Sequence, residues 1–295
     1  MVGRLSAGLG TEGLTTVAEE APVERFAAMG TRVELHGFAA SDAVALSAAR
    51  RAIVAVDDAL TIHRPSPLTA LNADLLAGRE ATVDVPILID ALAAAEAAQA
   101  ATFGLFDVAA DRGTGGAWAM VRFDRARGTV SADRPLALDF GGLGKGIALD
   151  RAAAVLRAAG VASALLSAGE SSILALGDHP LGGRWPFAIP HPTQADATLL
   201  EVELRDKALS ISATVGAGAA APERAAMIRP GDAAIVDAPC CTVAIAATGT
   251  AAEAMSTALL VADPARLARL LHDSADTSFR FDLFAVASQP TRMYA

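Results

Sequence analysis

The clearest pattern of apolar and polar positions lies near the N-terminal end of the chain. Apolar residues recur there at intervals of three and four: Leu46, Ala49, Ile53, Val56 and Leu60. This spacing predicts a helix with one buried face, and Ser41 is a suitable N-cap for it. Residues 26–38 precede the helix and alternate between apolar and polar side chains, which predicts a strand.

Similar signals predict the remaining elements. Pro86 is well placed to begin a helix that runs to Thr102, with Gly104 beyond its end. Apolar positions after residue 147 predict another helix, closed by Gly160. Helices are also predicted from Thr250 and Pro264. Strands are predicted over residues 162–167, 173–176, 186–189, 199–204, 238–246 and 278–287.

Composition narrows the class of protein. Hydrophobic residues make up 53% of the 295 residues and charged residues 19%, which is typical of a globular protein. The net charge of −9 without a basic cluster makes nucleic acid an unsuitable partner. We find neither a strongly apolar run long enough to span a membrane nor a signal-like apolar core near the N-terminus, so we expect a cytoplasmic protein.

The neighbouring residues Cys240 and Cys241 suit neither a disulfide framework nor a zinc site. We expect two buried, reduced thiols in an apolar strand. The first 25 residues are expected to form a flexible tail. No internal repeat or low-complexity linker divides the rest, so residues 26–295 are expected to form one domain.

A glycine-rich stretch from Leu138 to Asp150 carries the most specific chemistry. A predicted strand ends at Asp139 and Phe140, and a helix is predicted to begin near Ile147. Between the end of the strand and the start of the helix lie four glycines: Gly141, Gly142, Gly144 and Gly146. Such residues let a ligand approach the backbone, and a helix N-terminus favours an anion. Lys145 adds a positive charge, and Asp139 offers a carboxylate to a sugar or base. The alternative is a glycine-rich turn with an exposed lysine.

A second candidate site lies at the start of the helix after Thr250. Glu253 and Thr257 lie one helical turn apart on the same face. Their oxygen atoms suit a hard cation such as Mg²⁺. The alternative is a capping box, in which Glu253 closes back on the backbone N–H of Thr250.

The glycine-rich stretch resembles the central signature of the ApbE family, the FAD:protein FMN transferases. Further matches follow the order and spacing of that family: Met29-Gly30-Thr31, His63-Arg64-Pro65-Ser66-Pro67-Leu68 with Leu71-Asn72, Gly104-Leu105-Phe106-Asp107, and Ala252-Glu253-Ala254-Met255-Ser256-Thr257-Ala258-Leu259. The resemblance implies an α+β fold of the ApbE type, with a mixed or antiparallel sheet core flanked by helices.

The resemblance also implies a function and a set of site residues. The expected activity is Mg²⁺-dependent transfer of FMN from FAD to a Thr or Ser of a target flavoprotein, with release of AMP. Flavin or adenine contacts are implied for Met29, His63, Leu105, Phe106, Asp107, Asp139, Lys145 and Ile228. Metal contacts are implied for the Gly142 carbonyl, Glu253 and Thr257.

Two positions depart from the family pattern. Met227 stands where family members usually have a His, and a thioether neither takes nor gives a proton. Glu253 stands where they usually have Asp. If that His serves as the general base, this chain lacks it, and the sequence identifies no catalytic residue. It leaves two alternatives open beside the transferase, namely hydrolysis of FAD to FMN and AMP, or FAD binding without turnover. A structural protein that kept only the scaffold is a third.

Overall fold

The computed structural model describes residues 21–111, 116–192, 194, 196–214, 227–236, 239–273, 277–282 and 291–294. Its centre is a seven-stranded sheet with the order β1-β2-β6-β7-β10-β13-β14, in which every neighbouring pair is antiparallel. These strands are β1 (Val23–Ala28), β2 (Thr31–Gly37), β6 (Ala164–Ala168), β7 (Ser172–Leu176), β10 (Lys207–Ala213), β13 (Cys240–Ala246) and β14 (Thr277–Asp282). The expected α+β fold with an antiparallel core is confirmed.

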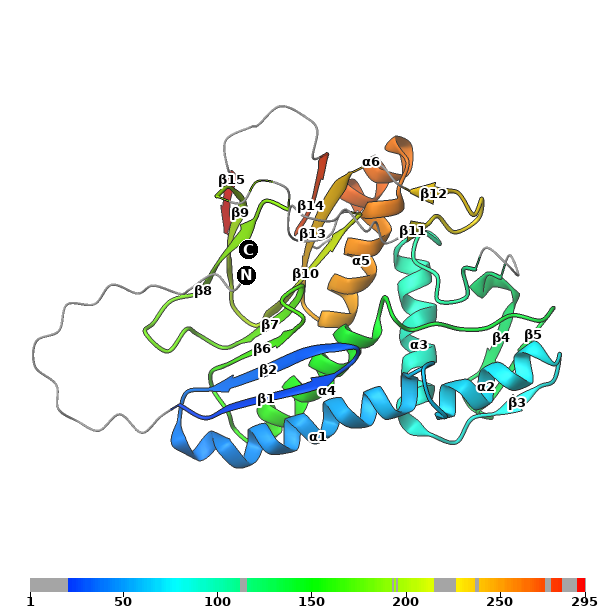
Figure 1. Cartoon of the computed structure of the whole chain (residues 1–295), viewed down its shortest axis with the longest axis horizontal. Coiled ribbons are helices and arrows are strands. Elements are labelled where there is room, and N and C mark those ends of the chain that lie inside the picture. The colour runs from blue at the N-terminus through cyan, green and yellow to red at the C-terminus, as the bar shows by residue number, and fades with distance from the viewer. Residues whose placement is uncertain are drawn as a thin grey trace, which may run out of the picture.

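Helices and three small sheets surround this core (Figure 1). The helices are α1 (Ala43–Leu60), α2 (Pro67–Leu76), α3 (Pro86–Ala101), α4 (Gly144–Ala158), α5 (Gly249–Val261) and α6 (Pro264–Asp273). One small sheet has the order β15 (Thr291–Tyr294), β9 (Thr198–Leu204), β8 (Trp185–Pro190). A second has the order β3 (Ala81–Thr82), β5 (Thr129–Ala132), β4 (Val121–Asp124), and the third pairs β11 (Met227–Ile228) with β12 (Ile235–Val236).

The two faces of the central sheet contribute to different cores. Along β13, Ala244 and Ala246 join the main apolar cluster with residues of α1, α4 and α5. The alternate residues Val243 and Ile245 join a second cluster with β8 and β9. Successive strand side chains point to opposite faces, so helices cover one face and the β8–β9 sheet covers the other (Figure 1).

The predicted strand over residues 26–38 is a hairpin. Strand β1 pairs with β2 with Ala28 opposite Thr31, so the chain reverses over Met29 and Gly30. Both residues have positive φ, 55° and 68°, as in the tight turns that match strand twist. An alternating pattern does not show where a strand reverses. Because β1 begins at Val23, residues 23–25 belong to the sheet and not to the predicted tail; residues 1–20 lie outside the described residues.

Helices α1 and α3 agree with their sequence patterns, except at the start of α1. The predicted stripe of α1 is buried from Leu46 to Leu60. Asp42, and not Ser41, precedes the helix, and its carboxylate accepts the backbone N–H groups of Phe38 and Ala39 at 3.0 Å. The short 3-10 turn Ala40–Asp42 precedes the helix, and the N-cap lies one residue later than predicted.

The segment before the glycine-rich turn is not a strand. Leu138 bonds instead to the side-chain amide of Asn72, whose oxygen accepts the Leu138 N–H and whose nitrogen donates to its carbonyl, both at 2.9 Å. Asp139 N–H donates to the carbonyl of Val108 at 2.8 Å. The side chain of Asn72 thus makes the hydrogen bonds that a partner strand would make if this segment were the predicted strand.

Cys240 and Cys241 are thiols buried on β13, as expected. Burial is the main cause that raises the pKa of the Cys241 thiol to about 12. In the described part of the chain, no helix combines the length and apolarity needed to cross a bilayer. The last predicted strand is present as β14, while residues 283–287 of that prediction lie outside the described residues.

Candidate functional site

The glycine-rich turn opens directly into helix α4. Gly141 and Gly142 are exposed, and the helix begins at Gly144, earlier than the predicted start near Ile147. The carboxylate Oδ1 of Asp139 accepts the N–H of Gly141 at 2.8 Å. Among the described residues this is the only hydrogen bond made by the Asp139 side chain, which is itself exposed. The turn therefore exposes the backbone of two glycines and the carboxylate of Asp139 at a helix N-terminus.

The first turn of α4 lies directly against the first turn of α5. A Cβ placed on Gly146 would overlap the Gly249 carbonyl, and one placed on Gly249 would lie 2.9 Å from the Gly146 carbonyl oxygen. Two glycines are needed here because the helices approach backbone to backbone. The N-terminal ends of both helices thus converge beside the glycine-rich turn.

Asp150 of α4 fixes this arrangement. Its Oδ1 accepts the N–H of Gly249 at 2.6 Å, and its Oδ2 accepts both the N–H and the hydroxyl of Thr250 at 2.9 and 2.6 Å. These donors belong to the unpaired first turn of α5 and need an acceptor. Burial nonetheless raises the pKa of the Asp150 carboxyl above its ordinary value.

The capping box proposed from Thr250 and Glu253 is wrong. The N-cap of α5 is Thr248, whose hydroxyl accepts the N–H of Ala251 at 3.1 Å. Thr250 bonds to Asp150 instead. Glu253 is consequently available for a different partner.

That partner is Lys145. Its ammonium lies 3.3 Å from both carboxylate oxygens of Glu253, and the hydroxyl of Ser172 donates to Glu253 Oε1. The Glu253 side chain is 3% exposed and that of Lys145 is 22% exposed. A buried carboxylate is stable only with a cation and hydrogen bonds close by. The two residues chosen from separate motifs therefore form one ion pair.

A group of hydroxyls continues from this ion pair into the sheet. Ser256, one turn after Glu253, lies with its hydroxyl 2.9 Å from those of Ser210 and Ser212 on β10. Thr242 on β13 donates its hydroxyl to the Ser256 carbonyl at 2.7 Å. These bonds fasten α5 to the sheet and fix the helix that carries Glu253.

Two of the expected flavin contacts lie against the glycine-rich turn. A Cβ on Gly144 would lie 2.6 Å from the terminal methyl of Met29, and one on Gly142 would lie 3.2 Å from the ring of Phe106. The tip of the β1–β2 hairpin thus reaches the start of α4 (Figure 1). Met29 is half-buried, whereas Leu105 and Phe106 are buried.

Asp107 is occupied by the backbone of its own loop. Its carboxylate accepts the N–H of Ala109 at 2.8 Å and that of Trp118 at 2.9 Å. The pKa of the Asp107 carboxyl is raised, and burial is the main cause. In the structure Asp107 therefore shapes the segment that holds Phe106 against Gly142.

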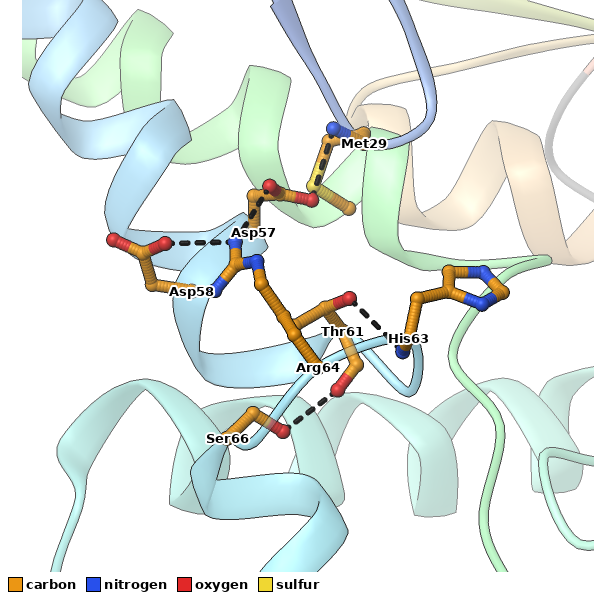
Figure 2. A network of polar contacts seen from close by, with 7 residues as sticks. All are labelled: Met29, Asp57, Asp58, Thr61, His63, Arg64 and Ser66. Atoms are coloured by element: carbon orange, nitrogen blue, oxygen red, sulfur yellow. Dashed lines mark hydrogen bonds and ion pairs between the residues drawn. The ribbon is translucent and has the colours of Figure 1, made fainter.

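His63, another of the expected flavin or adenine contacts, lies in the loop between α1 and α2. Its backbone N–H donates to the Thr61 hydroxyl at 3.3 Å. The imidazole is exposed and points away from Asp57 and Asp58 (Figure 2). The loop ends at Ser66, the N-cap of α2, and Pro67 is the first residue of that helix.

Residues 29–281 match the model of the ApbE family. The chain belongs to the ApbE family.

Solved structures of ApbE proteins share the fold. The apo form of the flavinyl transferase ApbE from Pseudomonas stutzeri matches with a TM-score of 0.74 and 20% identity, over 88% of this chain and 90% of that chain. The flavin transferase ApbE from Vibrio cholerae gives 0.73 and 17%, over 88% and 93%. The ApbE protein from Thermotoga maritima gives 0.68 and 18%, over 86% and 91%. No curated protein sequence matches this one.

Met227, the position where the sequence predicts a departure from the family pattern, lies on a short hairpin. Met227 and Ile228 form β11, which pairs with β12, and both are half-buried. Met227 packs against the main apolar cluster. The thioether thus serves as an apolar packing group in this ApbE protein.

The oxygen donors expected to hold a metal suit Mg²⁺ in chemical type. Gly142 is exposed, Thr257 is half-buried one turn beyond Glu253, and Glu253 provides the carboxylate. A carbonyl, a hydroxyl and a carboxylate are all hard oxygen ligands. The Glu253 carboxylate already has Lys145 and Ser172 as partners, so a bound cation would share it with them.

Three residues contribute to the candidate site although the sequence assigns them no role in it. Ser172 directly precedes the strand predicted over residues 173–176, and Asp57 lies in the first predicted helix outside its apolar stripe. Asp150 is the last residue of the glycine-rich stretch, and the sequence assigns it no role. Each acts on a residue far along the chain, and no short-range signal in the sequence indicates such a contact.

Proposed function

We propose that this ApbE protein transfers FMN from FAD to the hydroxyl of a Thr or Ser in a target flavoprotein and releases AMP. Membership of the family and the likeness in fold to flavin transferases support the proposal. The observation that carries it is the exposed Gly141–Gly142 turn beside the Lys145–Glu253 pair. That arrangement offers backbone N–H groups and a cation to a diphosphate, with a carboxylate beside them that is suited to Mg²⁺.

In this proposal, different residues of the chain bind different parts of FAD. Lys145 places a positive charge where the diphosphate approaches the start of α4, and the glycines allow contact with its backbone. Asp139 keeps Oδ2 for a hydroxyl or base of the ligand. We assign the flavin side to Met29 and His63, with Leu105, Phe106, Asp107 and Ile228 as the remaining contacts.

The metal site we propose comprises the Gly142 carbonyl, Glu253 and Thr257. Bound there, Mg²⁺ would polarise the diphosphate and stabilise charge on the departing AMP. Glu253 is held for this task by the Ser172 hydroxyl. Lys145 contributes a second positive charge on the same side of the site.

A second candidate is FAD binding without turnover, and Met227 is the observation that favours it. Attack by an acceptor hydroxyl needs a group that removes its proton, and a thioether cannot do so. The binding groups of the site are unaffected by this substitution. Such a protein would hold FAD at the same turn and release no AMP.

The test is incubation of the protein with FAD and Mg²⁺, with and without a peptide library randomised around a central Thr or Ser. We expect covalently flavinylated peptide and an equal amount of AMP. AMP with free FMN in the absence of peptide would show hydrolysis instead. Bound FAD with no AMP under either condition would show a binding protein.

A further inference from the structure

One carboxylate connects the two elements assigned to the flavin side of the site. Asp57 lies in the last turn of α1. Its Oδ1 accepts the backbone N–H of Met29 at 2.9 Å, and its Oδ2 accepts an N–H of Arg64 at 3.0 Å. Figure 2 shows Asp57 between the hairpin turn and the loop that carries Arg64 and His63.

Asp57 stands where helix electrostatics oppose a negative charge. The C-terminal turn of a helix carries partial negative charge, and both Asp57 and Asp58 lie there. Arg64 bonds to both, with its Nη2 2.8 Å from Asp58 Oδ1. The side chain of Asp57 is 26% exposed and that of Asp58 is 59% exposed. Only Asp57 combines partial burial with a bond to the hairpin.

Both ends of this connection reach residues of the proposed site. Met29 has a φ of 55°, in the left-handed region that residues other than glycine rarely adopt, and the Asp57 carboxylate accepts its N–H. Its side chain extends to Gly144 at the start of α4. Arg64 directly follows His63, and the Ser66 hydroxyl donates to the Thr61 carbonyl at 2.6 Å, which closes the loop.

We propose that Asp57 is a positioning residue that holds Met29 and His63 in register for the flavin ring of FAD. This inference rests on the proposed function, because it assigns the flavin to the space between the hairpin and the loop. It assigns no contact between Asp57 and the ligand. The diphosphate and adenine are bound by other residues, so the loss of Asp57 should act on the flavin end alone.

The first experiment needs no ligand. Amide hydrogen exchange of the hairpin reports the Met29 N–H bond in wild type, Asp57→Ala, Asp57→Asn and Asp58→Asn. In Asp57→Ala we expect exchange at Met29 to accelerate about tenfold or more, because a hydrogen bond to a charged group is lost. Asp57→Asn retains an oxygen that can accept the Met29 N–H, and Asp58→Asn leaves that hydrogen bond intact. The exchange rate at Met29 should therefore stay close to the wild-type rate in both variants. Unchanged exchange in Asp57→Ala would overturn the proposal whatever the protein binds.

The second experiment compares binding of FAD with binding of ADP, which lacks the flavin. In Asp57→Ala we expect the Kd for FAD to rise about tenfold, equivalent to about 1.4 kcal/mol, with the Kd for ADP nearly unchanged. Asp57→Asn should recover part of this loss, and Asp58→Asn should bind both ligands like wild type. An equal loss of both ligands would show a merely structural role and overturn the proposal. If wild type binds ADP but not FAD, the proposed function fails, and the exchange result still decides whether Asp57 holds the hairpin.

Discussion

Gly146 of α4 and Gly249 of α5 touch backbone to backbone. A side chain on Gly249 would begin 2.9 Å from the Gly146 carbonyl oxygen, a distance that real Cβ atoms essentially never show. This contact brings the first turns of the two helices together. It is the reason that Lys145, one residue before Gly146, faces Glu253, four residues after Gly249.

The first prediction concerns this crossing. Gly146→Ala should lower the free energy of unfolding by about 3 kcal/mol, because its methyl group meets the rigid backbone of Gly249. Gly144→Ala is the matched control on the same helix. Its methyl group meets the flexible end of Met29, and alanine favours the helix, so its change should stay within about 1 kcal/mol. Urea denaturation measures both, and equal losses would contradict the account.

The second prediction concerns the ion pair. Lys145→Met should destabilise the protein by about 3 kcal/mol, because the buried Glu253 carboxylate then lacks its cation. Glu253→Gln should cost less, since Lys145 is 22% exposed and can be solvated. The double variant Lys145→Met/Glu253→Gln should lose less free energy of unfolding than the two single variants lose together. Strict additivity in denaturation experiments would show that the two side chains do not interact.

The third prediction concerns pH and Asp150. Burial holds its pKa above the ordinary value of 3.8, so the folded protein binds this proton more tightly than the unfolded chain does. Stability from the group therefore increases as the pH falls through the raised pKa, and it is lost as the pH rises. Asp150→Asn cannot titrate and turns an amide donor toward backbone N–H groups. It should destabilise the protein by about 1–3 kcal/mol at neutral pH.

The difference between wild type and Asp150→Asn should then grow as the pH is lowered from about 7 towards about 4. Urea denaturation of both proteins at several pH values measures it, and other groups that titrate in both proteins cancel in the difference. A difference that shrinks on acidification would contradict the assigned direction of the pKa shift.

The sequence was a good guide where structure depends on nearby residues. The stripe of α1 and the proline at the start of α3 are local signals, and both helices are present. Cys240 and Cys241 were expected to be buried, and they are. These predictions needed only periodicity and the chemistry of one segment.

Prediction from sequence failed where a distant group decides the local structure. The residues before Gly141 looked like a strand, yet Asn72 holds them through its side chain. Thr250 and Glu253 fitted a capping box, yet Asp150 binds Thr250. The sequence identifies Lys145 and Glu253 as separate candidate site residues, but nothing in it indicates that they form a pair. Long-range contacts of this kind leave no periodic pattern.

The most direct test of the account is titration of the purified protein with FAD, in the presence and absence of Mg²⁺, following bound flavin and released AMP. We predict that FAD binds, that Mg²⁺ strengthens binding and permits AMP release, and that Lys145→Met weakens binding in both conditions. Absence of FAD binding with and without Mg²⁺ would contradict the assignment of the glycine-rich turn, Lys145 and Glu253 to an FAD site.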